Sequence, residues 1–486
     1  MPQMINSNIA SLTAQRNLNT SQSSLNTSLT RLSSGLRINS AKDDAAGLAI
    51  SERMTSQIRG LNQAARNAND GISLSQTAEG ALGEIGNNLQ RIRELAVQSA
   101  NATNSASDRA SLQAEAAQLT AEITRVASQT QFNGTNLLDG SFLNQSFQVG
   151  ANANQTINIS SIGDSRSTAL GSNILNTTGT AMGTTTAAAA ALAANGVAVE
   201  ADLALTTNKG AVTGISYAAG ADAKTIAAAI NTAATNIGIT ATATNNATLG
   251  NLGSAGTVSM TLNGSSVSAV VTDKSDLSSL AASINGLQST TGVTASFATP
   301  GNKSVITLST TDGRDITVVD FNNTGATKTA DIVAGTTTTT LTGGAATDST
   351  TITGTIELAS SAGQITAGNA NASVFGTSVS AFNSVATLDL LSATNSQAAL
   401  KTLDAALAQI NSTRGDLGAI QNRFSSTIAN LQSTSENLSA SRSRIQDADF
   451  ATETANMTRG QILQQAGVAI LAQANSLPNN VLSLLR

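Results

Sequence analysis

The chain has 486 residues, of which 40% are hydrophobic but only 2% aromatic, and its formal net charge is −5. It contains no histidine and no cysteine, which excludes histidine-based acid–base catalysis, thiol nucleophiles and the common zinc sites. We therefore expect no metal and no cofactor. The length allows roughly three domains. With so few aromatic residues, the cores must be aliphatic and rich in alanine, which suits helical bundles better than an ordinary globular enzyme.

The charge is distributed unevenly along the chain. Residues 1–150 and 381–486 hold 18 basic and 18 acidic residues, whereas residues 151–380 hold 7 basic and 12 acidic residues. Balanced ends suit subunits that pack on copies of themselves, and an acidic middle suits a surface that faces solvent. No basic patch suggests a nucleic-acid partner. No apolar run approaches the ~18 residues of a membrane span, and the N-terminus lacks the pattern of a cleaved signal peptide.

Apolar residues recur at helical spacing near the N-terminus. Four leucines at heptad spacing are predicted to lie in a coiled-coil core: Leu25, Leu29, Leu32 and Leu36. The pattern weakens over residues 33–47, which we interpret as a connector. There Asp43 and Asp44 are predicted to cap a helix that begins near Ala45. The helical pattern then returns and continues to residue 96, with a slip after Ile72; residues 101–107 are predicted to form a turn, and a third helix follows to residue 126.

A longer helical pattern lies near the other end of the chain. Nine of thirteen heptad positions there are apolar, and these are predicted to complete the coiled-coil core: Leu403, Leu407, Ile410, Leu417, Phe424, Ile428, Leu431, Leu438 and Ile445. A helix of this span is ~65 Å long and cannot bury its seam alone. An ordinary long amphipathic helix is the alternative, but two ends with matching patterns favour a coiled coil.

The middle of the chain has a different character. Residues 131–165 alternate with period two around the turn signals Asn133-Gly134 and Asp139-Gly140, which predicts a small β element. A repeat follows at an offset of 54 residues, in which 226–231 resembles 280–285 and 237–243 resembles 291–297. Each copy is predicted to be a short helix followed by a strand. Residues 176–387 are thus interpreted as one or two β-rich domains, although low complexity alone could explain the threonine runs.

Four segments resemble the signature segments of bacterial flagellins. Residues 32–50 read LSSGLRINSAKDDAAGLAI, residues 90–99 read QRIRELAVQS, residues 129–134 read QTQFNG, and residues 480–486 read NVLSLLR. The resemblance covers roughly residues 1–165 and 395–486. These motifs are long and specific, whereas the middle is similar to the family only loosely, through its repeat.

The resemblance implies an α+β, multidomain protein whose terminal helices pair into a rod around a β-rich insertion. Residues 1–42 and 447–486 would form a terminal coiled coil, residues 43–175 and 388–446 a helical rod, and residues 176–387 a surface-exposed variable insertion. The implied function is that of a structural subunit without enzymatic activity. Copies would leave the cell unfolded through the flagellar type III route, without a cleaved signal peptide. They would then polymerise into the extracellular flagellar filament for motility.

Other functions are compatible with some of these features. The main alternative is the hook–filament junction protein of the same apparatus, whose termini are similar, and another is a secreted polymeric adhesin. The segment 129–134 and the ending Leu484-Leu485-Arg486 favour a flagellin over a junction protein. Some flagellins carry a zinc peptidase in the insertion, but this would need histidines, which the chain lacks.

The resemblance also implies partners other than a copy of the chain. These are the filament cap, the hook-associated junction proteins, a flagellin export chaperone and the flagellin-sensing Toll-like receptor of animal hosts. The receptor would read the surface around Arg91, Leu95 and Glu115. The chaperone would bind apolar residues of the C-terminal stretch before secretion: Ile462, Leu463, Val468, Ile470, Leu471, Val481, Leu482, Leu484 and Leu485.

Overall fold

The structure is a computed structural model that describes residues 7–297 and 301–484. It divides into two compact units, and each is described by itself. Unit 1 holds the described residues of Met1–Gln76, Leu143–Ser161 and Leu417–Arg486, and unit 2 holds those of Thr77–Phe142 and Ile162–Asp416. Long terminal helices and a β-rich middle confirm the predicted α+β class.

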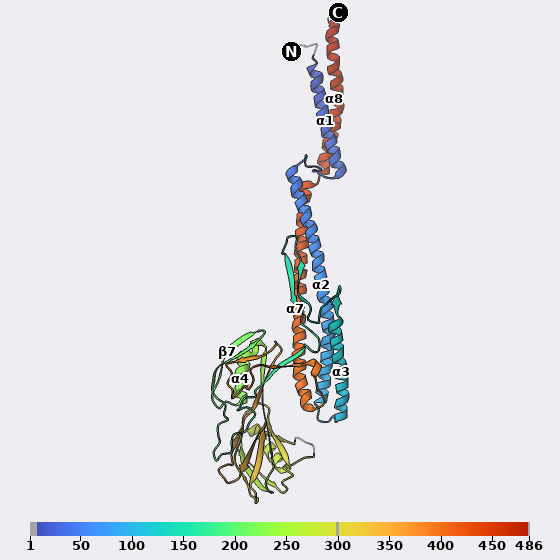
Figure 1. Cartoon of the computed structure of the whole chain (residues 1–486). Coiled ribbons are helices and arrows are strands. Elements are labelled where there is room, and N and C mark those ends of the chain that lie inside the picture. Colours follow the sequence, from blue (N-terminus) through green and yellow to red (C-terminus); the bar gives the residue numbers. More distant parts are fainter. Residues whose placement is uncertain (1–6, 298–300, 485–486) are drawn as a thin grey trace. The chain divides into compact units, whose positions relative to one another are not determined.

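Unit 1 is built from helices of both chain ends and one β-hairpin. Its helices are α1 (Ile9–Ser34), the start of α2 (Ala45–Ser99), the end of α7 (Ala393–Gln446) and α8 (Phe450–Leu484), and α1 lies beside α8 (Figure 1). The hairpin consists of β3 (Leu143–Gln148) and β4 (Thr156–Ser161). Helix α1 begins where the Asn8 side chain accepts from the Ser11 backbone N–H, and it ends at Gly35, whose φ of 72° is left-handed.

The two aspartates of the connector have different roles. Asp44 Oδ1 accepts a hydrogen bond from the Gly47 backbone N–H at 2.8 Å, so Asp44 caps the start of α2 as predicted. Asp43 instead accepts from the backbone N–H groups of Asn39 at 3.1 Å and Ser40 at 2.9 Å. The prediction that Asp43 also caps α2 is therefore wrong, because its carboxylate faces back along the connector and orders it.

Helix α2 is continuous through the slip that follows Ile72 in the sequence pattern. Its buried stripe continues through Gly71 and Ser75, and the Ser75 hydroxyl donates to Gly71 O at 2.8 Å. The Phe424 ring occupies the space opposite, where a Cβ added at Gly71 would lie 2.6 Å from Phe424 Cζ. The Phe147 ring of the hairpin packs edge-on against Phe424, with centroids 5.6 Å apart. Small residues continue the stripe because the facing side chain is large.

Helix α7 carries five large buried residues at intervals of seven. These are Leu403, Ile410, Leu417, Phe424 and Leu431, all less than 9% exposed. The other predicted core residues of this helix are partly buried: Leu407, Ile428, Leu438 and Ile445. The first of the two predicted heptad positions, which includes Leu403 and Phe424, thus faces the centre of the seam. The second, which includes Leu407 and Ile428, lies at its side.

Unit 2 contains the β-rich middle together with the rest of α2 and α7 and the helix α3 (Ala106–Gln129). Asn133 and Gly134, with φ of 49° and 80°, form the tight turn between β1 (Gln131–Phe132) and β2 (Thr135–Asn136), as the sequence predicts. A three-stranded sheet has the order β18-β6-β7: β18 (Thr366–Gly368), β6 (Glu200–Thr207) and β7 (Gly210–Tyr217).

Two larger antiparallel sheets form most of the middle. The four-stranded sheet has the order β10-β9-β13-β16: β10 (Ser265–Val271), β9 (Gly256–Leu262), β13 (Ile316–Asn323) and β16 (Thr350–Ile352). The eight-stranded sheet follows β11-β12-β8-β17-β5-β19, with β14 pairing β8 and β15 pairing β14. Its strands are β11 (Thr294–Ser296), β12 (Val305–Thr310), β8 (Ile239–Gly250), β17 (Thr355–Ser360), β5 (Gly171–Asn176), β19 (Ala381–Ser384), β14 (Thr329–Ala334) and β15 (Thr337–Thr342). Short helical turns lie at α6 (Gln288–Thr291), η1 (Thr235–Ile237) and η2 (Val385–Thr387).

The internal repeat is confirmed. In the first copy α4 (Ala223–Ala234) precedes β8, and in the second α5 (Ser278–Gly286) precedes β11 (α4 and β7 are labelled in Figure 1). Asn231 donates to Ala241 O at 2.8 Å and accepts from Ala241 N at 2.7 Å. Asn285 makes the same two bonds with Ala295, at 2.8 and 2.7 Å. Each copy thus ties its helix to its strand by the same paired amide contact.

A polar layer interrupts the long strand β8 between two apolar cores. Ile239 belongs to one core and Leu249 to the other, and between them Asn245 lies on the same buried face, only 1% exposed. Its amide donates to Arg314 O and Ile352 O. Nearby, Asp315 Oδ2 accepts from the Asn195 side chain at 2.7 Å. Burial raises the pKa of Asp315 from 3.8 to about 6.

The aromatic contact in unit 1 yields a stability prediction. Phe424→Ala should lower the free energy of unfolding by ~3–5 kcal/mol, because the site next to Gly71 cannot close without bending two helices. The measurement is urea unfolding of the soluble monomer followed by circular dichroism. The control is Phe450→Ala, since Phe450 is 69% exposed and should leave the transition unchanged. An unchanged transition for Phe424→Ala would show that the ring is not packed in the monomer.

Asp315 yields a pH prediction with a defined sign. Because its folded pKa of about 6 lies above the ordinary 3.8, the native state favours the protonated form. The resulting stability is complete below about pH 3.8 and is lost as the pH rises through about 6. Asp315→Asn should remove this slope and raise the free energy of unfolding at pH 7 by about 2 kcal/mol. The measurement is urea unfolding at several pH values between 4 and 7.5.

The matched control is Asp312→Asn. Hydrogen bonds from Arg314, followed by those from Lys224, lower the pKa of Asp312, so its contribution to stability has the opposite sign and is lost only in stronger acid. This variant should keep the slope between pH 4 and 7. If Asp315→Asn also keeps the slope, Asp315 is not the group that titrates.

Candidate assembly surface

Helices α1 and α8 pair antiparallel along one narrow seam. Seven covered residues of α1 follow a regular 3-4 spacing: Ser11, Ala14, Leu18, Ser21, Leu25, Ser28 and Leu32. Those of α8 follow the same spacing in the opposite direction: Glu453, Met457, Gly460, Gln464, Gly467, Leu471 and Ala474. This is the heptad period of a two-helix seam, and it is made largely of small and polar side chains.

Large residues of one helix face glycines of the other. A Cβ added at Gly467 would lie 3.2 Å from Leu18 Cδ1, and one added at Gly460 would lie 3.4 Å from Leu25 Cβ. The absence of a side chain at both glycines lets the two backbones approach closely. The pair therefore buries leucine against backbone rather than against a second layer of large side chains.

Polar contacts define the register of the pair. At one end, the Asn8 amide donates to Ala474 O at 2.9 Å, and the Ser11 hydroxyl donates to Asn475 Oδ1 at 2.7 Å. In the middle, Gln464 donates to Gln22 at 2.6 Å. At the other end, Arg31 Nη1 and Glu453 Oε1 form an ion pair at 3.0 Å.

The connectors of the two chain ends meet next to this pair. Leu36 and Asp447 form an antiparallel β-bridge, and the Ala448 backbone N–H donates to Gly35 O at 2.9 Å. Arg37 donates from its backbone to Gln446 O at 2.7 Å and from its guanidinium to Ile445 O at 2.6 Å. A guanidinium at this position satisfies carbonyls at the end of α7 and complements the helix dipole. Sequence reasoning missed Arg37, since nothing local marks a partner 408 positions away.

The N-terminal residues predicted for the coiled-coil core do not all lie in the seam. Leu25 is buried, Leu32 and Leu36 are partly buried, but Leu29 is 45% exposed. The prediction for Leu29 is therefore wrong for this seam. The physical reason is that Ser28, which is 7% exposed, takes the place of Leu29 in the seam. A small residue fits there because α8 approaches closely.

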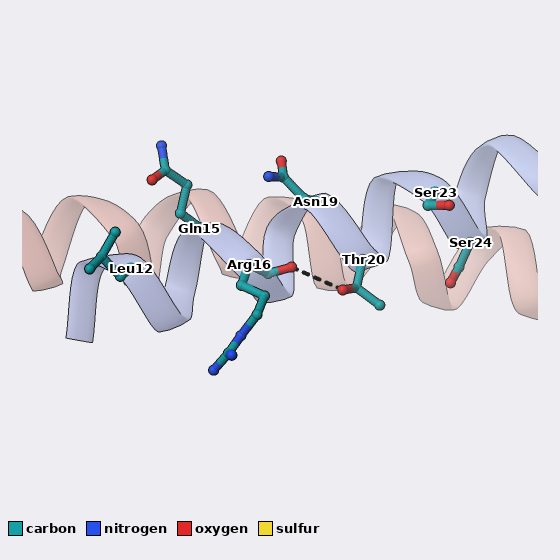
Figure 2. A pocket seen from close by; sticks show the side chains of 7 residues that line it. All are labelled: Leu12, Gln15, Arg16, Asn19, Thr20, Ser23 and Ser24. Atoms are coloured by element: carbon teal, nitrogen blue, oxygen red, sulfur yellow. Dashed lines mark hydrogen bonds between the residues drawn. The ribbon is translucent and has the colours of Figure 1, made fainter. Parts of the chain in front are cut away.

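Most of the surface of the helix pair is open. Figure 2 shows a shallow groove on α1 lined by seven of its side chains, with α8 running alongside: Leu12, Gln15, Arg16, Asn19, Thr20, Ser23 and Ser24. One of these, the Thr20 hydroxyl, donates to Arg16 O at 2.9 Å. The groove offers hydroxyls, amides and one cation but no pair of acid–base groups, so it suits packing rather than catalysis.

The apolar residues predicted to bind a chaperone are exposed on α8 where they are described. Ile462, Leu463, Val468 and Ile470 are 50–60% exposed, and Leu471 is partly buried in the seam. Val481, Leu482 and Leu484 belong to the helix, but their side chains are not described, and Leu485 lies outside the described residues. On α1, Ile9 and Leu12 are each 63% exposed.

The predicted receptor residues belong to unit 2 and are not all accessible. Arg91 of α2 pairs with Glu115 of α3 at 2.8 Å and with Glu94 at 2.9 Å, and its side chain is half exposed. Leu95 is only 1% exposed, so its predicted place on an outer face is wrong. The reason is that α2 has neighbours on two sides, α3 through Arg91–Glu115 and α7 through Arg93–Asp404.

The described residues contain no cluster of three or more His, Cys, Asp or Glu side chains that could hold a metal ion. Within the same part of the chain, no helix combines the length and the apolar character needed to cross a bilayer.

Comparisons with known proteins agree with one another. A family model described as "Bacterial flagellin N-terminal helical region" matches residues 5–143, and one described as "Bacterial flagellin C-terminal helical region" matches residues 400–485. The chain is 45% identical to a B-type flagellin of Pseudomonas aeruginosa, with 99% of each chain covered. It is 42% identical to a flagellin of Salmonella rubislaw over both complete chains, and 36% identical to flagellin B of Vibrio cholerae, with 99% of each covered.

The similarity of this chain to solved structures is weaker than its similarity to the sequence relatives. The one described as FliC from Burkholderia pseudomallei covers 73% of this chain and 99% of its own, at 22% identity and a TM-score of 0.30. At that TM-score the superposition carries no argument, and the assignment rests on the sequence relatives.

The glycine seam yields a graded prediction. Gly460→Leu should prevent self-assembly, because its side chain would occupy the space of Leu25, while Gly460→Ala should be tolerated. Alanine meets only ordinary van der Waals contact there and favours the helix by ~1 kcal/mol. Self-assembly is measured by sedimentation. The control is Gly415→Leu, since no atom outside its own stretch of helix backbone lies within 4 Å of the Cβ position at Gly415. Normal assembly of Gly460→Leu would contradict the close-packed seam.

Proposed function

Because the chain belongs to the bacterial flagellin family, we propose that it polymerises mainly through its paired terminal helices. The chain is a structural subunit of the bacterial flagellar filament, which lies outside the cell. Full-length relatives that are flagellins disfavour the junction protein and the adhesin as alternatives. We propose no enzymatic role.

One observation supports this proposal above the others: the helix pair exposes apolar side chains on faces that point away from its seam. Ile9 and Leu12 on α1 and Ile462 and Ile470 on α8 are each at least 60% exposed. A helix pair with so narrow a buried stripe is marginal in water by itself. Neighbouring copies that cover these residues would supply the missing burial, so folding of the chain ends and assembly would occur together.

The same exposed residues suggest what happens before assembly. We propose that a flagellin export chaperone covers Ile462, Leu463, Val468 and Ile470 until the chain leaves the cell unfolded by the type III route, without a cleaved signal peptide. The filament cap and the hook-associated junction proteins would then meet the same helix pair at the ends of the filament. Recognition by the flagellin-sensing Toll-like receptor of animals would use the accessible pair Arg91–Glu115, since Leu95 is buried.

We also propose the five-segment division for the assembled state. Residues 1–42 and 447–486 would form the terminal coiled coil, residues 43–175 and 388–446 the rod, and residues 176–387 the surface insertion. The insertion supports this by having apolar cores of its own.

Deleting residues 180–385 and joining the rod with a short linker should preserve filaments. The expectation follows from those self-contained cores, which leave the helical ends with their own seams. Electron microscopy of seeded monomers is the measurement.

The matched comparison removes residues 1–40 or 450–486, which should abolish filaments but leave unit 2 folded. Filaments from either truncation, or their loss in the deletion while circular dichroism shows intact helices, would contradict the proposal.

A further inference from the structure

The apolar seam between α1 and α8 repeats with a period of seven residues. Leu18 and Leu25 on α1 are seven positions apart, and so are their partners Gly467 and Gly460 on α8. A slip of one heptad would place Leu25 against Gly467 and Leu32 against Gly460, restoring both leucine–glycine contacts. The two helices would then be shifted by about 10 Å. The leucines and glycines therefore define the face of contact but not the register.

The ion pair Arg31–Glu453 does not repeat. It is the one ion pair between α1 and α8 within the described residues, and its side chains are 29% and 8% exposed. In the slip that preserves the leucine–glycine contacts, Glu453 would lie beyond the end of α1 and Arg31 would face Gln461. In the opposite slip, Glu453 would lie against Leu25. Either slip breaks the ion pair. The first leaves Arg31 in the seam without its carboxylate, and the second leaves Glu453 in the seam without its cation, and a desolvated unpaired charge is strongly unfavourable.

The pair is better suited to selecting a register than to adding stability. Within the described part of the chain, Arg31 Nε and Glu453 Oε2 are buried without a hydrogen-bond partner. A half-satisfied buried ion pair gains little over neutral side chains, yet breaking it costs much. The amide contact Gln464–Gln22 is uncharged, so its loss on slipping opposes the slip less.

We propose that Arg31 and Glu453 are positioning residues that set the register of the terminal helix pair as it forms during assembly. The inference rests on the proposed function, in which the chain ends fold as copies polymerise. The location of the pair supports it, since the β-bridge Leu36–Asp447 lies within a few residues of both Arg31 and Glu453 along the sequence. A correct register at the ion pair brings the two connectors together, so that Arg37 reaches the end of α7.

Charge reversal tests this proposal. Arg31→Glu and Glu453→Arg should each raise the critical concentration for filament assembly about tenfold or more, and the double reversal should bring it back to within about threefold of the parent. The control combines Arg16→Glu with Glu453→Arg; it has the same net charge as the rescued variant but no matched pair, because Arg16 lies on the exposed face of α1. Normal assembly of the single variants, or rescue by the control, overturns the proposal. If the parent chain itself forms no filaments, the proposed function fails instead.

Mixing the single variants separates a contact within one chain from a contact between copies. The ion pair lies within one chain, so a mixture of Arg31→Glu and Glu453→Arg subunits should not assemble better than either alone. Efficient assembly of the mixture would show that the pair forms between copies and would overturn the proposal as stated.

Cross-linking reports the register directly, because the chain has no cysteine of its own. Ser21→Cys with Gln464→Cys should form a disulfide in the observed register, and Ser28→Cys with Gln464→Cys only in the slipped one. The second disulfide should appear when Arg31→Gln and Glu453→Gln are added, since this neutral combination leaves no unpaired charge and should still assemble. If the neutral combination shows only the first disulfide, the ion pair does not set the register.

Discussion

The narrow seam between α1 and α8 is the constraint on which the proposed assembly of the chain depends. Each helix covers one heptad stripe, and that stripe is mainly serine, glycine, alanine and a few leucines. Such a stripe removes little apolar area from water, so it cannot offset the entropy of ordering two long helices by itself. The exposed isoleucines and leucines on the outer faces are the surface that copies of the chain can bury. The narrow buried stripe thus makes the isolated helix pair marginally stable, and it also leaves the apolar surface that would stabilise a polymer.

Glycine opposite a large side chain is the packing device used along the helical part of unit 1. Gly71 faces the Phe424 ring, Gly460 faces Leu25 and Gly467 faces Leu18. In each case a larger side chain packs against bare backbone, so the helices approach closely. Phe424 and Leu25 are buried there, and Leu18 is partly buried. Glycine in a helix costs about 1 kcal/mol relative to alanine. The large side chain that faces each glycine explains why glycine stands there. Without that side chain, alanine at the same position would make the helix more stable.

The long-period features of the fold could be predicted from the sequence, and the features that depend on a distant partner could not. Residues close together in the sequence predict three features: the seven-residue spacing of α7, the Asn133-Gly134 turn, and the repeat around Asn231 and Asn285. The sequence pattern misplaces Leu29 because leucine is far more hydrophobic than serine, although Ser28 is the residue that fits the close seam. Leu95 was misplaced because a helix with neighbours on two sides buries a wider face than one stripe. Arg37 has no local signature, since its acceptors lie at the other end of the chain.

The proposed assembly through the helical ends also requires that the β-rich middle does not associate through its sheet edges. A free strand edge offers unpaired backbone groups to any passing strand. Strand β10 is such an edge in the four-stranded sheet, and helix α5 covers it: the Ser279 hydroxyl donates to Val270 O at 2.8 Å, and the Ser283 hydroxyl donates to Ser268 O at 3.1 Å. The two serines are one helical turn apart and meet two carbonyls that point out of the same edge, so a neighbouring copy finds them already occupied. Helix α5 thus protects this edge of the four-stranded sheet from pairing with a strand of a neighbouring copy.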